Sequence, residues 1–245
     1  MMQESESREY AKSVVAAFAG KAPQAITLLS SGHGPLGWSQ NRIWKADIQG
    51  RDALVLKLGD GPMSELVLRE IDLLEEVLPT SHPNLPVVHS FSREPTPYVL
   101  MEWLTPVLPY PDLADTPSAI LHELGRALAT ILLSCKSECL VAELPGRKDI
   151  PGVPSAVSYG YLNLRNLGRR TDGTLVIFDW DGVRIAPLGS DFKLFQKHRA
   201  FAETMVVFHD DCQNAGFGLP SFDEWLKRLL EMWKEEDEML RISQL

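Results

Sequence analysis

The sequence has 245 residues, a formal net charge of −9 and a hydrophobic content of 44%. This length and apolar content are sufficient for one large or two modest cores, and they exclude a disordered chain or a disulfide-stapled miniprotein. The acidic balance argues against a protein that mainly coats nucleic acid or an anionic membrane, because both tasks need a concentrated positive surface.

The N-terminal part of the sequence is rich in β-like segments. An amphipathic helix is predicted at residues 8–19, and apolar residues at helical period predict a second helix at 64–78, which Pro79 ends. Alternating or apolar runs predict five strands, at residues 26–30, 42–48, 53–58, 85–91 and 98–104. We therefore expect a small antiparallel sheet with one inserted helix.

The C-terminal part reads as mainly helical. Prolines after Trp103 disfavour regular structure and separate the two parts. Helices are predicted at residues 117–134, about 190–212 and 221–242. The segments YLNLRNL and TLVIFDW, joined by TDG, predict one short hairpin. This order predicts two lobes, residues 1–104 and 105–245.

Three glycines, Gly32, Gly34 and Gly37, form the pattern GxGxxG. A dinucleotide-binding fingerprint needs this pattern between a strand and a helix, whereas here it lies between two predicted strands. That position favours a kinase-type loop that covers the phosphates of a nucleotide. An ordinary flexible loop is the alternative.

Lys57 lies in the apolar strand VLKL, where an inward-facing lysine needs an anionic partner. Glu70 on the following helix can supply that partner, and Glu65 is the rival. In the kinase arrangement such a pair positions the phosphates of a nucleotide. A solvent-facing lysine is the alternative.

Asn166 and Asp179 lie on the two arms of the predicted hairpin. Amide and carboxylate oxygens that converge there suit Mg²⁺ carrying phosphates. Turn chemistry or strand capping would explain either residue alone.

Taken in order, these segments resemble the aminoglycoside phosphotransferase and choline kinase family, which is distantly related to the protein kinases. GWSQNRIWKA, VLKL and LVLREIDLLEEV resemble its nucleotide loop, lysine strand and glutamate helix. PNLPVV and YVLMEWL resemble the strand before the hinge and the hinge, and LGRALATIL resembles the long helix of the C-lobe. YGYLNLRNLG, IFDWD and APLGSDF resemble the catalytic loop, the metal-binding strand end and the structural aspartate segment.

The resemblance implies an α+β, two-lobed protein-kinase-like fold and the cofactors Mg²⁺ and ATP, or another nucleoside triphosphate. It implies that the hinge takes the adenine through backbone groups and that Asn166 and Asp179 hold the metal. By this resemblance the nucleotide-binding residues are Gly34, Gly37, Ser39, Lys57, Glu102, Trp103 and Leu104. The catalytic residues that it implies are Lys57, Glu70 and the residue at the position of the catalytic aspartate, Tyr161.

The catalytic loop departs from the family pattern His-Gly-Asp-x-His-x-x-x-Asn. Tyr161 stands at the position of the catalytic aspartate, and Tyr159 and Asn163 replace the two histidines. A phenol with a pKa near ~10 does not deprotonate an acceptor hydroxyl as a carboxylate does. General-base assistance is worth about 10²- to 10⁴-fold in rate. We therefore expect a phosphotransferase with weakened activity; Asp181 is a substitute acid to consider.

The alternative is a non-catalytic pseudokinase scaffold or nucleotide sensor that acts through a protein partner. The segment 136–157 is too short for the additional helices with which many relatives shape an acceptor pocket, so a C-lobe of reduced size is expected. The expected partners are a nucleotide and a small-molecule hydroxyl acceptor, with no nucleic acid and no membrane. The sequence shows neither a spanning segment nor a secretion signal, which predicts a cytoplasmic location.

Overall fold

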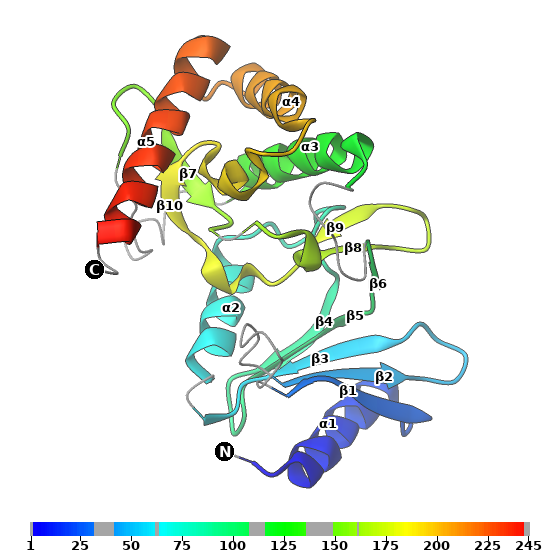
Figure 1. Ribbon diagram of the computed structural model, residues 1–245. Helices are drawn as coiled ribbons and strands as arrows, with labels where there is room; N and C mark the ends of the chain where they lie inside the picture. Colours follow the sequence, from blue (N-terminus) through cyan, green and yellow to red (C-terminus); the bar gives the residue numbers. More distant parts are fainter. Residues whose placement is uncertain are drawn as a thin grey trace.

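Five strands form one antiparallel sheet in the order β1-β2-β3-β5-β4 (Figure 1). The computed structural model describes residues 2–31, 42–61, 64–107, 116–135, 149–160 and 162–242. Its strands in this sheet are β1 (Ala25–Ser31), β2 (Arg42–Asp47), β3 (Leu54–Leu58), β4 (Val88–Ser92) and β5 (Tyr98–Glu102). Each strand overlaps its predicted range, so the predicted sheet is confirmed.

Two helices cover opposite faces of this sheet, α1 (Glu4–Ala19) and α2 (Ser64–Glu76). Successive side chains of a strand point to opposite faces. Leu56 of β3 accordingly packs in one apolar cluster with Val15 of α1, whereas Val55 packs in another with Ile71 of α2. Lys57, two residues after Val55, therefore faces α2.

The strand predicted at 85–91 begins later than expected, at Val88. The Val87 amide donates to the Glu102 carboxylate at 2.8 Å, so it is engaged with a side chain and not with a strand neighbour. Pro86 has no N–H to donate. The Val87 carbonyl accepts from the Glu102 amide at 3.0 Å, so the chain before β4 is held by one backbone contact and one side-chain contact with Glu102.

The remainder of the chain is mainly helical, as predicted. Three helices, α3, α4 and α5, stack at the end of the molecule farthest from α1 (Figure 1). The helices and strands here are β6 (Thr105–Pro106), α3 (Ser118–Ser134), β7 (Ser155–Ser158), β8 (Leu167–Arg169), β9 (Leu175–Ile177), β10 (Arg184–Pro187), α4 (Phe201–Asn214) and α5 (Phe222–Ile242). The predicted hairpin is β8–β9, and a second antiparallel pair, β7 with β10, was not predicted.

The helix predicted at about 190–212 is wrong in its first part. Residues Ser190–Phe195 form a short 3₁₀ helix, η5, and α4 begins only at Phe201. The Asp191 carboxylate is turned inward, where it accepts hydrogen bonds from Ser158 and Gly160. Between the two helices, the His198 ring accepts a hydrogen bond from the Ala200 amide at 3.0 Å. These contacts interrupt the apolar period.

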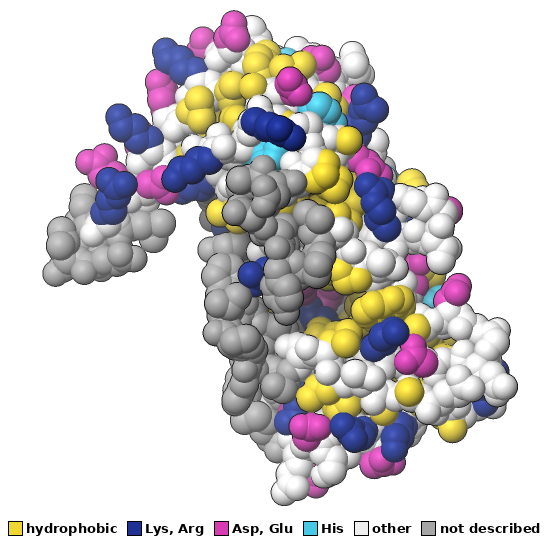
Figure 2. Space-filling model, turned by 45° about the vertical axis from the view of Figure 1, so that its right-hand side comes forward, with side chains coloured by type: hydrophobic (Ala, Val, Ile, Leu, Met, Phe, Trp, Pro, Cys, Tyr) yellow, Lys and Arg dark blue, Asp and Glu magenta, His cyan; other side chains and the backbone are white. Residues whose placement is uncertain are grey.

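Apolar side chains of α3, α4 and α5 form the larger core. Its biggest members are wholly enclosed, among them Phe208, Trp225 and Trp233. The tryptophans of α5, Trp225 and Trp233, therefore serve packing. None of the described helices is long and apolar enough to cross a membrane. On the face shown in Figure 2, basic and acidic side chains are interspersed.

Candidate active site

Lys57 and Glu70 form a buried ion pair between β3 and α2. The Lys57 Nζ lies 2.7 Å from Glu70 Oε2, and each residue is only 3% exposed. Glu65, the rival partner, lies on the exposed side of α2. A buried lysine without a carboxylate would be strongly destabilising, so Lys57 needs an anionic partner of this kind.

Two aspartates from the other half of the chain complete the surroundings of Lys57. The Nζ lies 2.6 Å from Asp179 Oδ1 and 3.3 Å from Asp181 Oδ2. Burial alone would lower the pKa of Lys57, but Glu70, Asp179 and Asp181 outweigh it and hold that pKa well above its usual value. Lys57 is thus a permanent cation at neutral pH.

Asp181 belongs to the same charged cluster as Lys57, Glu70 and Asp179 and does not form a separate acidic group. Burial raises the pKa of Asp181, and the charge of Lys57 opposes that rise. Because Asp181 faces Lys57, it lies on the side of the site predicted to hold phosphates, which does not favour it as a substitute base for an acceptor. Its contact with Lys57 was not predicted, since it depends on how β3 meets the segment after β9.

The backbone at Asp179 is unusual. Asp179 has φ 67° and ψ 63°, and it is the only residue other than glycine with a positive φ among the described ranges. This left-handed conformation costs about 1–2 kcal/mol for a residue with a Cβ. Such conformations concentrate at functional sites, where the surrounding structure enforces them. Here the turn follows β9 directly and leaves the carboxylate beside Lys57.

Asn166 immediately precedes β8 and Asp179 follows β9, so the β8–β9 hairpin brings the two residues to the same end. The Phe178 amide donates to the Asn166 carbonyl at 3.0 Å. The Asn166 side chain donates from Nδ2 to the Tyr159 hydroxyl at 2.7 Å. Among the described residues no hydrogen bond reaches Asn166 Oδ1. An unengaged amide oxygen and a carboxylate are therefore available at adjacent strand ends.

Asp191 anchors the backbone of the loop before Asn166. Its carboxylate accepts hydrogen bonds from Ser158 Oγ at 2.8 Å, from the Gly160 amide at 2.8 Å and from the Tyr159 amide at 3.3 Å. Burial raises the pKa of Asp191, while these donors lower it. The resemblance places a structural aspartate in the segment APLGSDF. Asp191 is the aspartate of that segment, and its carboxylate accepts hydrogen bonds from three donors of the loop.

The hinge residues Glu102, Trp103 and Leu104 connect β5 to β6. The Glu102 amide donates to the Val87 carbonyl at 3.0 Å, and the Trp103 amide donates to the Ala53 carbonyl at 3.1 Å. The Leu104 amide has no acceptor among the described residues. Within the described ranges, Leu104 is thus the one of these three residues whose amide is not engaged.

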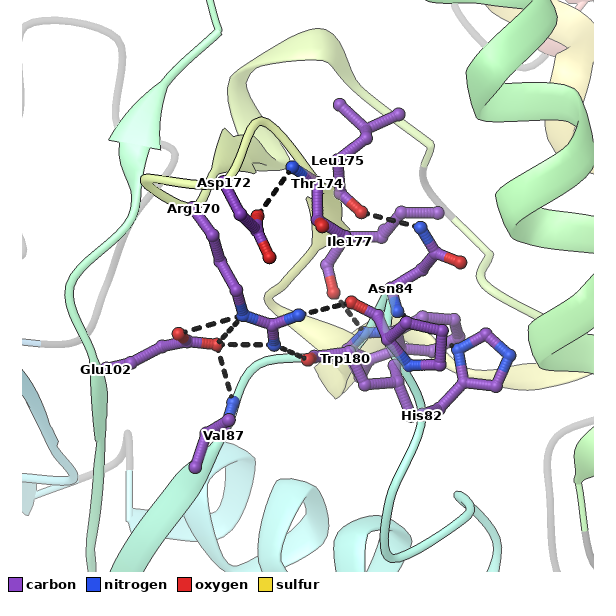
Figure 3. A network of polar contacts seen from close by, with 12 residues as sticks. His82, Asn84, Val87, Glu102, Arg170, Asp172, Thr174, Leu175, Ile177 and Trp180 are labelled. Carbon is purple, nitrogen blue, oxygen red and sulfur yellow. Dashed lines mark hydrogen bonds and ion pairs between the residues drawn. The ribbon is translucent and has the colours of Figure 1, made fainter.

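Arg170, at the turn between β8 and β9, contacts the hinge residue Glu102 (Figure 3). Its guanidinium donates to Glu102 through Nε at 3.0 Å and through Nη2 at 2.6 Å. It also donates to the carbonyls of Leu85, at 2.7 Å, and Pro83. Nearby, Asn84 Nδ2 donates to the Leu175 carbonyl at 2.7 Å. These contacts join the β8–β9 turn to the hinge, and sequence reasoning missed them.

Four of the predicted site residues, Gly34, Gly37, Ser39 and Tyr161, lie outside the described residues, and the structure adds nothing to their predicted roles. The remaining predicted residues fall into two groups. Lys57, Glu70, Asn166 and Asp179 meet in one site, and the hinge lies at the end of β5.

No protein-family model and no curated protein matches this sequence. Solved structures do match. The chain is 16% identical to the macrolide 2'-phosphotransferase MphH from Brachybacterium faecium, with a TM-score of 0.63 over 93% of this chain and 89% of that one. It is 13% identical to the choline kinase LicA from Streptococcus pneumoniae, with a TM-score of 0.57 over 95% and 92% of the two chains.

A third match is the spectinomycin phosphotransferase APH(9)-Ia, in complex with ADP and spectinomycin. The identity is 10% and the TM-score is 0.50, over 93% of both chains. Identities this low show the fold alone. The chain thus has the two-lobed, protein-kinase-like fold of the aminoglycoside phosphotransferases and choline kinases, which confirms the fold class that the sequence predicted.

Proposed function

We propose that this protein is a kinase-like phosphotransferase that binds ATP, or another nucleoside triphosphate, together with Mg²⁺ between its lobes. The lobes would be residues 1–104 and 105–245, as the sequence predicts. The observation that carries the proposal is the meeting of Lys57 with Glu70 and Asp179, at 2.7 Å and 2.6 Å, from three separate elements. Phosphoryl transfer depends mainly on such positioning and on electrostatic stabilisation.

The residues present fit a magnesium ion that is carried by phosphates. Asn166 Oδ1 and the Asp179 carboxylate are hard oxygen ligands of the kind Mg²⁺ prefers. The described residues contain no group of three or more His, Cys, Asp or Glu able to hold a metal by themselves. Two protein oxygens plus phosphate oxygens are the usual arrangement for Mg²⁺. When bound, the ion would neutralise charge on the transferred phosphoryl group.

Lys57 would contact the phosphates, and Glu70 would hold Lys57 in place. The glycine-rich loop with Gly34, Gly37 and Ser39 would cover the phosphates. At the hinge, the Leu104 amide would donate a hydrogen bond to a ring nitrogen of the nucleotide base. The ADP bound by the spectinomycin phosphotransferase that shares this fold supports nucleotide use.

The acceptor would be a small-molecule hydroxyl compound. The solved structures with this fold include proteins described as acting on macrolides, choline and spectinomycin, so the fold alone selects no acceptor. Tyr161 stands where a catalytic aspartate is expected, and a phenol is a poor general base at neutral pH. We therefore infer weakened transfer. The cytoplasmic location stays a prediction.

Tyr161 also favours a second candidate, a pseudokinase scaffold or nucleotide sensor that acts through a protein partner. In that case Lys57, Asn166 and Asp179 would still bind Mg-nucleotide, and transfer would be absent. The two candidates agree on the nucleotide and differ in turnover.

ADP release from ATP in the presence of a panel of small hydroxyl compounds tests the proposal. We expect slow release that depends on Mg²⁺ and on one acceptor, and that D179N abolishes. Release with no acceptor dependence, or release unchanged in D179N, would contradict phosphotransferase activity at this site. Absent turnover in the wild type that appears in Y161D would establish the pseudokinase alternative.

A further inference from the structure

We infer that Tyr159 is a positioning residue of the candidate metal site, whose hydroxyl turns the side-chain amide of Asn166 so that Oδ1 faces the cation. The inference rests on the proposed function, since it concerns how one of the proposed metal ligands is oriented. It assigns a task to a residue that replaces a family histidine and has no other proposed role.

The hydrogen-bond pattern fixes the direction of the amide. The Tyr159 hydroxyl lies 2.6 Å from the Phe178 carbonyl oxygen, which can only accept. The single hydroxyl proton is therefore committed to Phe178, and the oxygen has only lone pairs left for Asn166. Asn166 must consequently present its NH₂ group, at 2.7 Å. An amide turned by half a rotation would place two lone pairs against each other.

The hydroxyl is locked in this arrangement by packing. Tyr159 is 1% exposed, and its ring meets Trp180 edge to face at 4.8 Å between centroids. Trp180 is itself held by a hydrogen bond from its indole N–H to the Ile177 carbonyl at 2.8 Å.

The same hydroxyl links both proposed metal ligands. Phe178, whose carbonyl it holds, immediately precedes Asp179, and the Phe178 amide donates to the Asn166 carbonyl at 3.0 Å. Tyr159 thus connects the loop anchored by Asp191 to the two adjacent strand ends. Partners that orient a metal ligand commonly contribute 10- to 100-fold to metal affinity, about the effect expected here.

The inference is tested on the full chain by the binding of Mn²⁺ in the presence of ADP. Binding is measured as the loss of the free Mn²⁺ resonance in electron paramagnetic resonance spectra. We expect Y159F to weaken the affinity by about tenfold. N166A should weaken it at least as much. Because Tyr159 acts through Asn166, the double variant Y159F/N166A should bind no more weakly than N166A alone.

Y10F is the matched control. The Tyr10 hydroxyl also donates to a backbone carbonyl, that of Thr96, at 3.3 Å, but it lies between α1 and the sheet. The affinity of Y10F for Mn²⁺ with ADP should equal that of the wild type. Thermal unfolding without ligand verifies that each variant folds. Should Y159F not fold, Y159H replaces it: a neutral imidazole offers one donor and one acceptor, so Y159H should bind Mn²⁺ with ADP more tightly than N166A.

The outcomes separate this inference from the proposed function. A wild type that binds no Mn²⁺ with ADP overturns both. A wild type that binds, together with a Y159F that binds equally well, overturns only the role of Tyr159. Additive losses in Y159F/N166A, or a Y159H as weak as N166A, likewise overturn it, because Tyr159 would then act by a route other than Asn166.

Discussion

The Nζ of Lys57 lies 2.6 Å from Oδ1 of Asp179, although the two residues are 122 positions apart in the sequence. Lys57 comes from β3 of the sheet, and Asp179 follows β9 in the second half of the chain. The contact therefore brings the phosphate-side cation and a proposed metal ligand to one point between the two halves.

The buried pair of Lys57 and Glu70 predicts strongly non-additive effects on stability. K57M leaves the Glu70 carboxylate buried without its cation, and removing one partner of a buried pair costs about 3–5 kcal/mol. E70L leaves two carboxylates near Lys57 and should cost less. The double variant K57M/E70L should recover most of the loss in K57M, because apolar replacement of both partners is often neutral.

Urea denaturation measures these free energies of unfolding. The double variant should be folded and yet bind no Mg-ATP, which would separate the stabilising role of the pair from its role toward phosphates. A double variant that loses the sum of the two single losses would show that the two residues do not act as a pair.

Gly160 is predicted to be intolerant of any side chain. Its φ is +91°, and a Cβ would lie 2.0 Å from the Gly182 carbonyl oxygen. Gly173 has a similar φ of +88°, but a Cβ there meets nothing within 4 Å. G173A should therefore show only the left-handed strain of about 1–2 kcal/mol. G160A should lose clearly more, because the loop before Asn166 must also shift.

Thermal and urea unfolding measure the loss of stability in the two alanine variants. G173A reports backbone strain alone, and G160A reports backbone strain together with the steric clash against Gly182. Equal losses in G160A and G173A would contradict the close approach of the Gly160 loop to Gly182.

Arg170 is predicted to stabilise the hinge more than its neighbour Arg169 stabilises the C-lobe. R170M removes the donors to Glu102, whose side chain is 18% exposed. We expect a loss of about 2–3 kcal/mol, since the largely buried carboxylate then keeps, among the described residues, only the hydrogen bond from the Val87 amide. Arg169 pairs with Glu123, which is 39% exposed, so R169M should cost under about 1 kcal/mol.

Chemical denaturation of R170M and R169M checks this order. Nucleotide affinity should fall in R170M alone, because the Arg170 guanidinium contacts Glu102 at the end of the strand that leads to Leu104, whereas that of Arg169 pairs with Glu123. An R169M loss as large as that of R170M would argue against a special role for the hinge contact.

His82 predicts a decline in stability on acidification. Burial lowers the pKa of His82 from its usual value, and its Nδ1 accepts a hydrogen bond from the Asn84 amide at 3.2 Å. The folded state therefore binds a proton less readily than the unfolded state. The corresponding stability is present above the unfolded pKa of about 6.5 and is lost as the pH falls through that of the folded state.

H82N keeps an acceptor at this position without a titrating ring. The wild type should lose stability relative to H82N between about pH 7 and pH 5, as measured by urea denaturation at each pH. A difference between the two proteins that is constant over this range, or that favours the wild type at low pH, would contradict the assignment to His82.

Local pattern predicted the parts of the site that lie on single elements. Helical period predicted a helix that offered Glu70, with Glu65 as the rival, to the strand lysine, and the TDG turn predicted that Asn166 and Asp179 would lie on adjacent strands. The glycine-rich loop and Tyr161 remain predictions, because they lie outside the described residues.

Contacts between distant segments could not be predicted. Arg170 and Glu102 are 68 residues apart, and nothing in either local sequence marks the other. The contact of Asp181 with Lys57 likewise depends on how β3 meets the turn after β9. The prediction of one helix at about 190–212 was wrong in its first part for a related reason. The contacts of Asp191 with Ser158 and Gly160 outweigh the apolar period there.

Calorimetric titration of Mg-ATP into the wild type, K57A and K12A tests the central claim most directly. Lys12 is an exposed lysine of α1 paired with Glu9, so K12A controls for the loss of one positive charge. We predict one Mg-ATP site per chain, with equal affinity in the wild type and K12A and at least about tenfold weaker affinity in K57A. No binding in any of the three proteins, or equal binding in all of them, would contradict a nucleotide site at Lys57.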